Sequence, residues 1–173
     1  METVKGPESM EERLERMVSM YQLSLLRLCY AYFHDEEMAK DAVQETFIKA
    51  YRHMDQFRET SSEKTWLSRI AINVSKDMRR SAWFKHVDRS ITLDMLPESA
   101  CPATEEHRNL TAEIMNLPPK LREAALLCWL QEMSYSEAAE ALEITHQAVS
   151  GRLDRARRKL RKALERSEDH DPA

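Results

Sequence analysis

The stretch from Ser134 to Leu164, SYSEAAEALEITHQAVSGRLDRARRKLRKAL, predicts two helices joined by a tight turn. Ser134 and Glu137 have the spacing of a capping box, in which the serine hydroxyl accepts from the backbone N–H of Glu137 and the carboxylate accepts from that of Ser134. Thr145 is the N-cap candidate of the second helix. Beyond it, apolar residues recur at steps of three and four, so the second helix has one buried side, formed by Val149, Leu153, Ala156 and Leu160.

The second of these helices is strongly basic. Between Arg152 and Lys162 there are seven basic residues and one acidic residue, Asp154, which gives this segment a net charge of +6. In a helix-turn-helix unit the second helix docks in the major groove of DNA, with its N-terminal side chains at base edges and basic side chains on phosphates. A basic helix that only faces water is the alternative. The capping box, the turn and the confinement of charge to the second helix favour DNA binding.

Composition favours helix throughout the 173 residues, which suffice for one domain or two small ones. There are only two glycines and six prolines, so we expect an all-α fold without a sheet. The net charge of -4 does not exclude nucleic acid, because a whole-chain sum hides local charge. With no apolar run of about 18 residues and no basic, apolar leader, we expect no membrane insertion, no signal peptide and a cytoplasmic location.

No pattern in the chain indicates catalysis. There is no nucleophile motif, no glycine-rich phosphate loop and no metal-binding spacing of cysteine and histidine. The three cysteines, Cys29, Cys101 and Cys128, lie far apart, and Cys29 and Cys128 fall in apolar helical runs typical of buried thiols. We therefore expect neither an enzyme nor a bound metal or cofactor.

Two helices are expected in the first 54 residues. Residues 1–12 are polar and acidic and are interpreted as a disordered leader, and a helical period then runs from Leu14 to Phe33. Asp35 is the N-cap candidate of the next helix, which runs to about Met54. Its expected buried stripe consists of Ala39, Ala42 or Val43, Thr46 or Phe47, Ala50, Tyr51 and Met54.

The outer side of this second helix holds an apolar residue among polar ones. The helical period places Ile48 outside, together with Asp41, Gln44, Glu45 and Arg52. An exposed isoleucine in this company suggests a partner surface, although a single exposed isoleucine needs no explanation. Spacing alone leaves both interpretations open.

A third helix is expected to open with a capping box made by Thr60 and Glu63. Its apolar stripe runs from Trp66 to Met78, and its opposite side carries Arg69, Asn73, Lys76 and Arg80. Such a mainly basic line could follow phosphates, or it could be an ordinary solvated face.

The helical period disappears after the third helix. Residues 86–108 contain five acidic and two basic residues and two prolines, which indicates a flexible, acidic linker. The sequence Leu117-Pro118-Pro119 marks a helix stop followed by a new start, and residues 124–130 are the expected core helix of a second domain. The predicted organisation is two small helical domains, at 13–85 and 109–166, with a leader at 1–12, the linker at 86–108 and an acidic tail at 167–173.

Four stretches in this order resemble the extracytoplasmic-function (ECF) sigma factors, the minimal two-domain sigma subunits of bacterial RNA polymerase. They are Asp41-Ala-Val-Gln-Glu-Thr-Phe47, Thr65-Trp-Leu-Ser-Arg-Ile-Ala71 with Asn73, Leu117-Pro118, and the unit from Ser134 to Leu160. The resemblance covers most of the chain. It implies an alternative sigma factor that binds core RNA polymerase and directs transcription initiation at a subset of promoters.

The resemblance also implies roles for particular residues. In the first domain, sigma region 2, the residues implied to bind the clamp helices of the polymerase's largest subunit are Asp41, Gln44, Glu45, Phe47 and Ile48. Those implied to read and open the minus-ten element are Arg58, Ser61, Ser62, Trp66, Arg69, Asn73, Lys76 and Arg80. In the second domain, region 4, those implied to read the minus-thirty-five element are His146, Gln147, Ser150, Arg152, Arg155 and Arg158. The polymerase flap and an inhibitory anti-sigma factor are further implied partners.

Two positions depart from the family pattern. Glu143 occupies the turn position where the family usually has glycine, so either the turn avoids a positive φ or the backbone is strained there. Ser150 stands where lysine is common in the recognition helix, and Gly151 where serine is frequent. These changes imply that the promoter sequence does not follow from the family.

Two other classes of protein remain as alternatives. A stand-alone helix-turn-helix regulator, with an N-terminal helical sensor or dimerisation domain, would bind duplex DNA without polymerase. A helical adaptor would bind only protein, and its basic cluster would be incidental. The segment from Asp41 to Phe47 discriminates, because only a sigma factor requires its exposed side to bind polymerase.

Overall fold

The computed structural model describes residues 8–57, 60–83 and 113–168, and these residues are helical apart from short turns. The helices are α1 (Met10–Phe33), α2 (Glu36–Arg52), η1 (Met54–Gln56), α3 (Glu63–Trp83), α5 (Pro119–Ala125), η3 (Leu126–Leu130), α6 (Tyr135–Leu142) and α7 (His146–Glu168). No strand occurs in the described ranges, so the all-α prediction is confirmed there. The predicted linker at 86–108 lies outside the described residues.

Helix α1 begins earlier than the sequence analysis expected. Ser9 and Glu12 form a capping box, in which the Glu12 N–H donates to Ser9 Oγ at 3.1 Å and the Ser9 N–H donates to Glu12 Oε2 at 2.9 Å. The expected start at Leu14 was therefore wrong, because the two residues satisfy N–H groups that would otherwise be unpaired at the helix start. Residues 10–12, assigned to the leader, are helical.

Helix α2 follows the prediction closely except at Tyr51. The Asp35 carboxylate caps the helix by accepting from the Met38 N–H at 2.8 Å. The expected stripe is buried, but Tyr51 is 37% exposed, and its hydroxyl donates to Glu11 Oε1 at 3.0 Å. Glu11 belongs to the extra turn at the start of α1, which the sequence analysis assigned to the leader. The earlier start of α1 therefore explains why Tyr51 was wrongly expected to be buried. The chain then leaves the α-helix at Arg52 and makes the short turn η1.

Helix α3 is capped by a different residue from the one predicted. Ser62 Oγ accepts from the Thr65 N–H at 3.1 Å, so the predicted capping box of Thr60 and Glu63 was wrong. The Glu63 carboxylate instead binds Arg13 and Arg16 of α1. Side chains along the apolar face of α3, including Leu67 and Val74, are buried against α1 and α2.

The C-terminal half contains the predicted helix-turn-helix. Pro119 is the first residue of α5, as the proline pattern predicted, and the helix widens into a single π-helical segment at η3. Helices α6 and α7 follow, and the apolar side of α7 packs on α5 and α6. Its Val149, Leu153 and Ala156 are fully buried, which confirms the predicted stripe.

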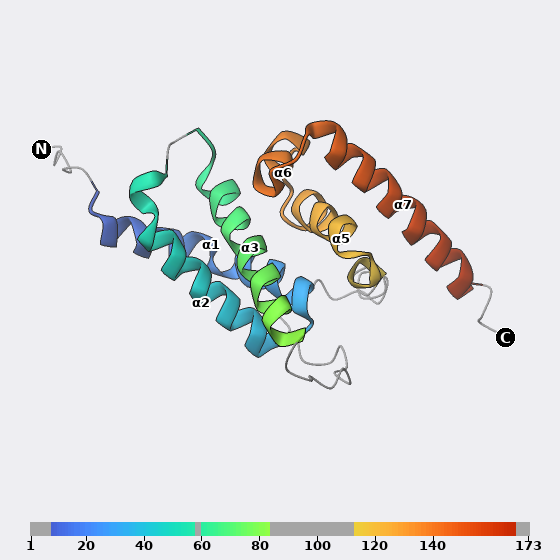
Figure 1. Ribbon diagram of the computed structural model, residues 1–173, viewed down its shortest axis with the longest axis horizontal. Helices are drawn as coiled ribbons and strands as arrows, with labels where there is room; N and C mark the ends of the chain where they lie inside the picture. Colours follow the sequence, from blue (N-terminus) through green and yellow to red (C-terminus); the bar gives the residue numbers. More distant parts are fainter. Residues whose placement is uncertain (1–7, 58–59, 84–112, 169–173) are drawn as a thin grey trace, which may run out of the picture.

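The two halves pack directly against each other. Figure 1 shows α3, in green, between the N-terminal helices and the group of α5, α6 and α7. Helix α3 contacts α6, α1 contacts η3, and the buried apolar residues of both halves form one continuous core in the described part of the chain. None of the described helices is long and apolar enough to cross a membrane.

The burial of α7 generates a prediction about stability. Leu153→Ala should lower the free energy of unfolding by about 2 to 5 kcal/mol, because it opens a cavity beneath α7. Leu164→Ala is the matched control, since Leu164 is 39% exposed and should change stability by less than about 1 kcal/mol. Urea denaturation followed by circular dichroism measures both. Equal losses in the two variants would contradict the assigned faces.

Candidate nucleic-acid interface and partner groove

The turn before α7 is built by two caps and one strained residue. Ser134 and Glu137 form the predicted capping box at the start of α6, with Glu137 N–H to Ser134 Oγ at 3.2 Å and Ser134 N–H to Glu137 Oε2 at 2.8 Å. Thr145 Oγ1 accepts from the Ala148 N–H at 3.1 Å, which confirms the predicted N-cap of α7. Between them, Glu143 has φ 55° and ψ 43°. The strained alternative is therefore the one found, because a side chain occupies a left-handed position that favours glycine.

The outer side of α7 presents most of the side chains predicted to read DNA. Those exposed are His146, Gln147, Arg155 and Arg158, and those half-buried are Ser150 and Arg152. The one acidic residue of the basic cluster, Asp154, pairs with Arg157 at 3.1 Å, and Arg157 also donates to the Tyr135 hydroxyl at 3.2 Å. Apart from the half-buried Arg152, the remaining basic side chains are exposed, in reach of a phosphate backbone.

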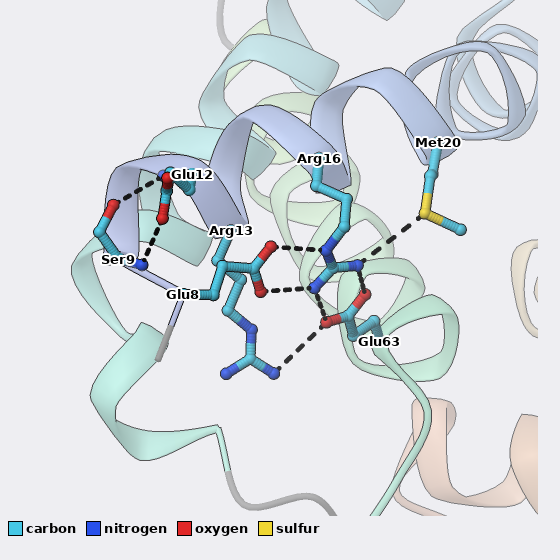
Figure 2. A network of polar contacts seen from close by, with 7 residues as sticks. All are labelled: Glu8, Ser9, Glu12, Arg13, Arg16, Met20 and Glu63. Atoms are coloured by element: carbon cyan, nitrogen blue, oxygen red, sulfur yellow. Dashed lines mark hydrogen bonds and ion pairs between the residues drawn. The ribbon is translucent and has the colours of Figure 1, made fainter. Parts of the chain in front are cut away.

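The start of α3 is held by a cluster of charged residues from α1. Figure 2 shows the Glu63 carboxylate accepting from two guanidinium nitrogens of Arg16, each at 2.8 Å, and from Arg13 at 3.3 Å. Arg16 also binds Glu8 at 2.9 Å. The hydrogen bonds from Arg16 lower the pKa of the Glu63 carboxyl, and the two carboxylates raise the pKa of Arg16. Periodicity did not reveal this cluster, because Glu63 lies 47 and 50 residues from its partners Arg16 and Arg13.

The same cluster orders the aromatic residues beside the loop before α3. The Arg13 guanidinium lies 4.9 Å from the centroid of the Phe57 ring, and the Phe57 and Trp66 rings are 4.8 Å apart. Of the residues predicted to contact the minus-ten element, Ser61 and Ser62 lie in the turn next to these rings, and Ser62 is engaged as the cap of α3. Arg58 lies outside the described residues.

The polar line along α3 is only partly open to solvent. Asn73 and Arg80 are exposed, as expected. Arg69 instead pairs with Glu143 at 2.5 Å, and Lys76 pairs with Glu123 at 3.2 Å. Both acidic partners belong to the C-terminal half, and no local sequence pattern pointed to them.

An apolar groove of about 570 Å³ lies between α1 and α2. Its lining includes three of the residues predicted to bind polymerase, Gln44, Phe47 and Ile48, beside Val18 and Leu26 of α1. Phe47 is buried in the groove, Ile48 is 38% exposed, and Asp41 lies exposed one turn before Gln44. The remaining predicted residue, Glu45, is half-buried on α2 but does not line the groove. Ile48 is therefore not an isolated exposed side chain, because it lines this groove together with Phe47 and the apolar residues of α1.

The described residues show no arrangement suited to a metal. No three side chains of histidine, cysteine, aspartate or glutamate converge there. Cys29 is buried, and burial raises the pKa of its thiol to about 12. Cys128 is half-buried, and its pKa is raised for the same reason.

Comparisons with known proteins agree with this organisation. Residues 17–85 match the family model of Sigma-70 region 2, and residues 107–160 match that of Sigma-70, region 4. The chain is 31% identical to the RNA polymerase sigma-H factor of Pseudomonas aeruginosa, over 95% of this chain and 97% of that protein. It is 32% identical to the ECF RNA polymerase sigma factor SigW of Bacillus subtilis, over 86% of this chain and 87% of that protein.

Solved structures show the same fold. CnrH, solved in complex with the cytosolic domain of CnrY, is 25% identical with a TM-score of 0.68, covering 90% of this chain and 89% of that one. RpoE of Bartonella quintana, solved in complex with the anti-sigma factor NepR, is 21% identical with a TM-score of 0.68, covering 89% of this chain and 98% of that one.

The chain belongs to the ECF family of RNA polymerase sigma factors. It is an alternative sigma factor that directs transcription initiation. The match to region 2 accounts for the N-terminal half of the chain. The alternative, a stand-alone regulator, would require this half to be a sensor, and no ligand for such a sensor is assigned.

The charge cluster at Glu63 generates a prediction about pH. Because the folded-state pKa of Glu63 is lowered, its contribution to stability is present above the ordinary value of 4.5 and is lost as the pH falls through the lowered pKa. Glu63→Gln should therefore lower the melting temperature at pH 7, and the difference from the unaltered protein should shrink as the pH falls below 4.5.

Asp77→Asn is the control for that measurement. Asp77 lies on the same helix, is 62% exposed, and its ion pairs with Lys49 and Arg80 are long, at 4.0 and 3.9 Å. Its substitution should change the melting temperature little at either pH. A Glu63→Gln difference that does not depend on pH would contradict the assigned role of the ionised carboxylate.

Proposed function

We propose that three surfaces of the chain perform the three binding functions of a sigma factor. The groove between α1 and α2 binds the clamp helices of the largest polymerase subunit, α3 with its preceding loop reads and opens the minus-ten element, and α7 reads the minus-thirty-five element. The observation that carries the proposal is the groove, because its exposed Ile48 and buried Phe47 form an apolar surface on which a helix can bind. A protein that bound only DNA would have no use for it.

Helix α7 has the charge and the capping of a recognition helix. Its buried stripe fixes which side faces outward, so that Gln147 and Ser150 near the N-terminus approach base edges while Arg155 and Arg158 contact phosphates. We assign the flap of the polymerase as a contact of the same half of the chain. Because Ser150 and Gly151 depart from the family pattern in α7, we assign no promoter sequence to this helix.

Opening of the minus-ten element requires a surface that holds unstacked bases. Trp66 and Phe57 provide aromatic faces beside the turn that contains Ser61, and Arg69 and Lys76 carry positive charge along α3. Aromatic faces and a basic track are the features that proteins use to bind single strands. The charge cluster at Glu63 sets the position of this turn relative to α1.

The proposed partners follow from the family. CnrH was solved in complex with the cytosolic domain of CnrY, and we propose that an anti-sigma factor likewise binds this chain and covers surfaces that polymerase uses. Because its proposed partners are polymerase and promoter DNA, we place the protein in the cytoplasm and assign it a binding role without catalysis. We assign region 2 to residues 13–85 and region 4 to residues 109–166.

The groove can be tested by direct binding to polymerase. Ile48→Glu should weaken binding to core RNA polymerase lacking sigma by tenfold or more, because it places a charge in an apolar interface. Met20→Glu is the matched control, since Met20 is 59% exposed on α1 and does not line the groove. Biolayer interferometry measures both affinities, and melting temperatures verify folding. Equal affinities of the two variants would overturn the assignment of the groove.

The DNA-facing side of α7 can be tested through salt dependence. Arg158→Ala should weaken binding to mixed-sequence duplex DNA and reduce the slope of log K against log salt by about 0.9, the loss of one phosphate contact. Arg157→Ala should have a smaller effect, because Arg157 is held by Asp154 and Tyr135. Fluorescence anisotropy titrations at several salt concentrations provide the slopes. If Arg157→Ala reduced the slope more than Arg158→Ala does, the assignment of the DNA-facing side of α7 would be wrong.

A further inference from the structure

Helix α7 contains a glycine that the backbone of the free chain does not require. Gly151 is the one glycine among the described residues, and it lies inside the helix. Its φ is not positive, so the left-handed freedom of glycine is not used there. A glycine inside a helix lowers stability relative to alanine, because it leaves the unfolded chain more conformational freedom. The helix therefore holds a residue that weakens it.

Packing within the chain does not require this glycine either. A β-carbon added at Gly151 would meet Arg155 Nη2 at 3.9 Å, which is an ordinary van der Waals contact. Apart from its neighbours in the chain, it would meet no other side chain of the described residues within 4 Å. Alanine would therefore fit in the free chain. The reason for glycine at this position lies in what α7 binds.

Gly151 lies on the outward side of α7. Val149 and Leu153, two residues before and after it, are fully buried, so the helical period turns Gly151 away from the core. Gln147 and Arg155, one turn to either side, are exposed. The space over Gly151 between these two longer side chains is here called the Gly151 gap. The edge of a base pair can approach the helix backbone most closely at this gap, because no side chain of Gly151 stands between them.

The backbone polar groups of Gly151 are already engaged. Its N–H is used within the helix, and its carbonyl accepts from Arg155 Nε at 2.9 Å in addition to its helical hydrogen bond. The Gly151 gap therefore presents an apolar surface, the Cα with its hydrogens. In the major groove, guanine, adenine and cytosine present donors or acceptors, whereas thymine also presents a methyl group. A methyl group can lie against this surface without giving up a hydrogen bond to water.

We propose that Gly151 determines part of the sequence specificity of α7, because its gap receives the 5-methyl group of a thymine in the minus-thirty-five element. The contact requires α7 to lie deep in the major groove, and the missing side chain permits this depth. The inference rests on the proposed role of α7 in reading that element. It goes beyond that role, because it assigns one base of an element for which the family pattern gives no sequence.

The cost of the glycine is tested on the full chain without DNA. G151A should raise the melting temperature by about 2 to 4 °C, because alanine favours the helix and meets no clash. A148G, the reverse change three residues earlier in α7, should lower the melting temperature. Circular dichroism during heating measures both. A lower melting temperature in G151A would show that the free chain needs the glycine, and would overturn the proposal.

The base is identified by selection from a pool of duplexes with a random central segment, with the full chain and without polymerase. The unaltered chain should enrich a motif with a fixed thymine. G151A should enrich a motif in which that thymine is no longer preferred, because the alanine methyl group occupies the gap. Enrichment of the same motif by both chains, or of no motif by the unaltered chain, would overturn the proposal.

The role of the methyl group is tested on the selected duplex, labelled with fluorescein, with that thymine replaced by deoxyuridine. The replacement should weaken binding of the unaltered chain about fourfold, the effect of one buried carbon. G151A should bind the thymine duplex about tenfold more weakly than the unaltered chain does, because its methyl group overfills the gap.

Two further comparisons separate this contact from a general loss of DNA binding. G151A should bind the deoxyuridine duplex more tightly than the thymine duplex, so the preference of the unaltered chain is reversed. Both chains should bind a mixed-sequence duplex equally, because the phosphate contacts remain. Fluorescence anisotropy measures all of these affinities. If G151A preferred thymine over deoxyuridine as strongly as the unaltered chain does, the contact would be ruled out.

The thymine contact and the proposed function can fail separately. If the selected thymine depends on Gly151 but core polymerase does not bind the chain, the contact stands and the proposed polymerase groove fails. If the chain directs transcription with core polymerase, and G151A selects the same duplexes as the unaltered chain, the proposed function stands and the contact fails.

Discussion

Packing of α3 against both halves of the chain is the interaction on which the rest of the structure depends. Its apolar face, with Leu67 and Val74, is buried against α1 and α2, and it also contacts α6 of the C-terminal half. The start of the helix is held by Arg13 and Arg16. Helix α3 therefore contributes to the core of the N-terminal bundle and to the contact between the two halves. It also bears the line of cations proposed to bind DNA.

Helix geometry explains how an acidic protein presents basic surfaces. In α7 the apolar residues at steps of three and four are buried, so the charged residues between them are forced to the outside. The total charge of -4 is a sum over the chain, whereas a ligand at α7 meets a segment with a charge of +6. Two acidic residues of the C-terminal half, Glu123 and Glu143, pair with Lys76 and Arg69 of α3.

Local patterns in the sequence were sufficient to predict most helices but not the contacts between them. The capping box at Ser134, the cap at Thr145 and the exposure of Ile48 depend on residues within one or two turns, and the structure confirms each of them. The predicted box at Glu63 failed because distant arginines compete for the same carboxylate. The pairs of Arg69 with Glu143 and of Lys76 with Glu123 join residues far apart in sequence, which periodicity cannot detect.

Run-off transcription tests the central claim most directly, because it requires polymerase binding, promoter recognition and DNA opening in one reaction. Purified protein, core polymerase lacking sigma and fragmented genomic DNA of the encoding organism are combined, and the Asp41→Ala, Ile48→Ala double variant serves as the comparison. We predict discrete transcripts with the unaltered protein and few or none with the double variant. No stimulation over core polymerase alone, together with sequence-specific binding of duplex DNA by the chain itself, would contradict the account.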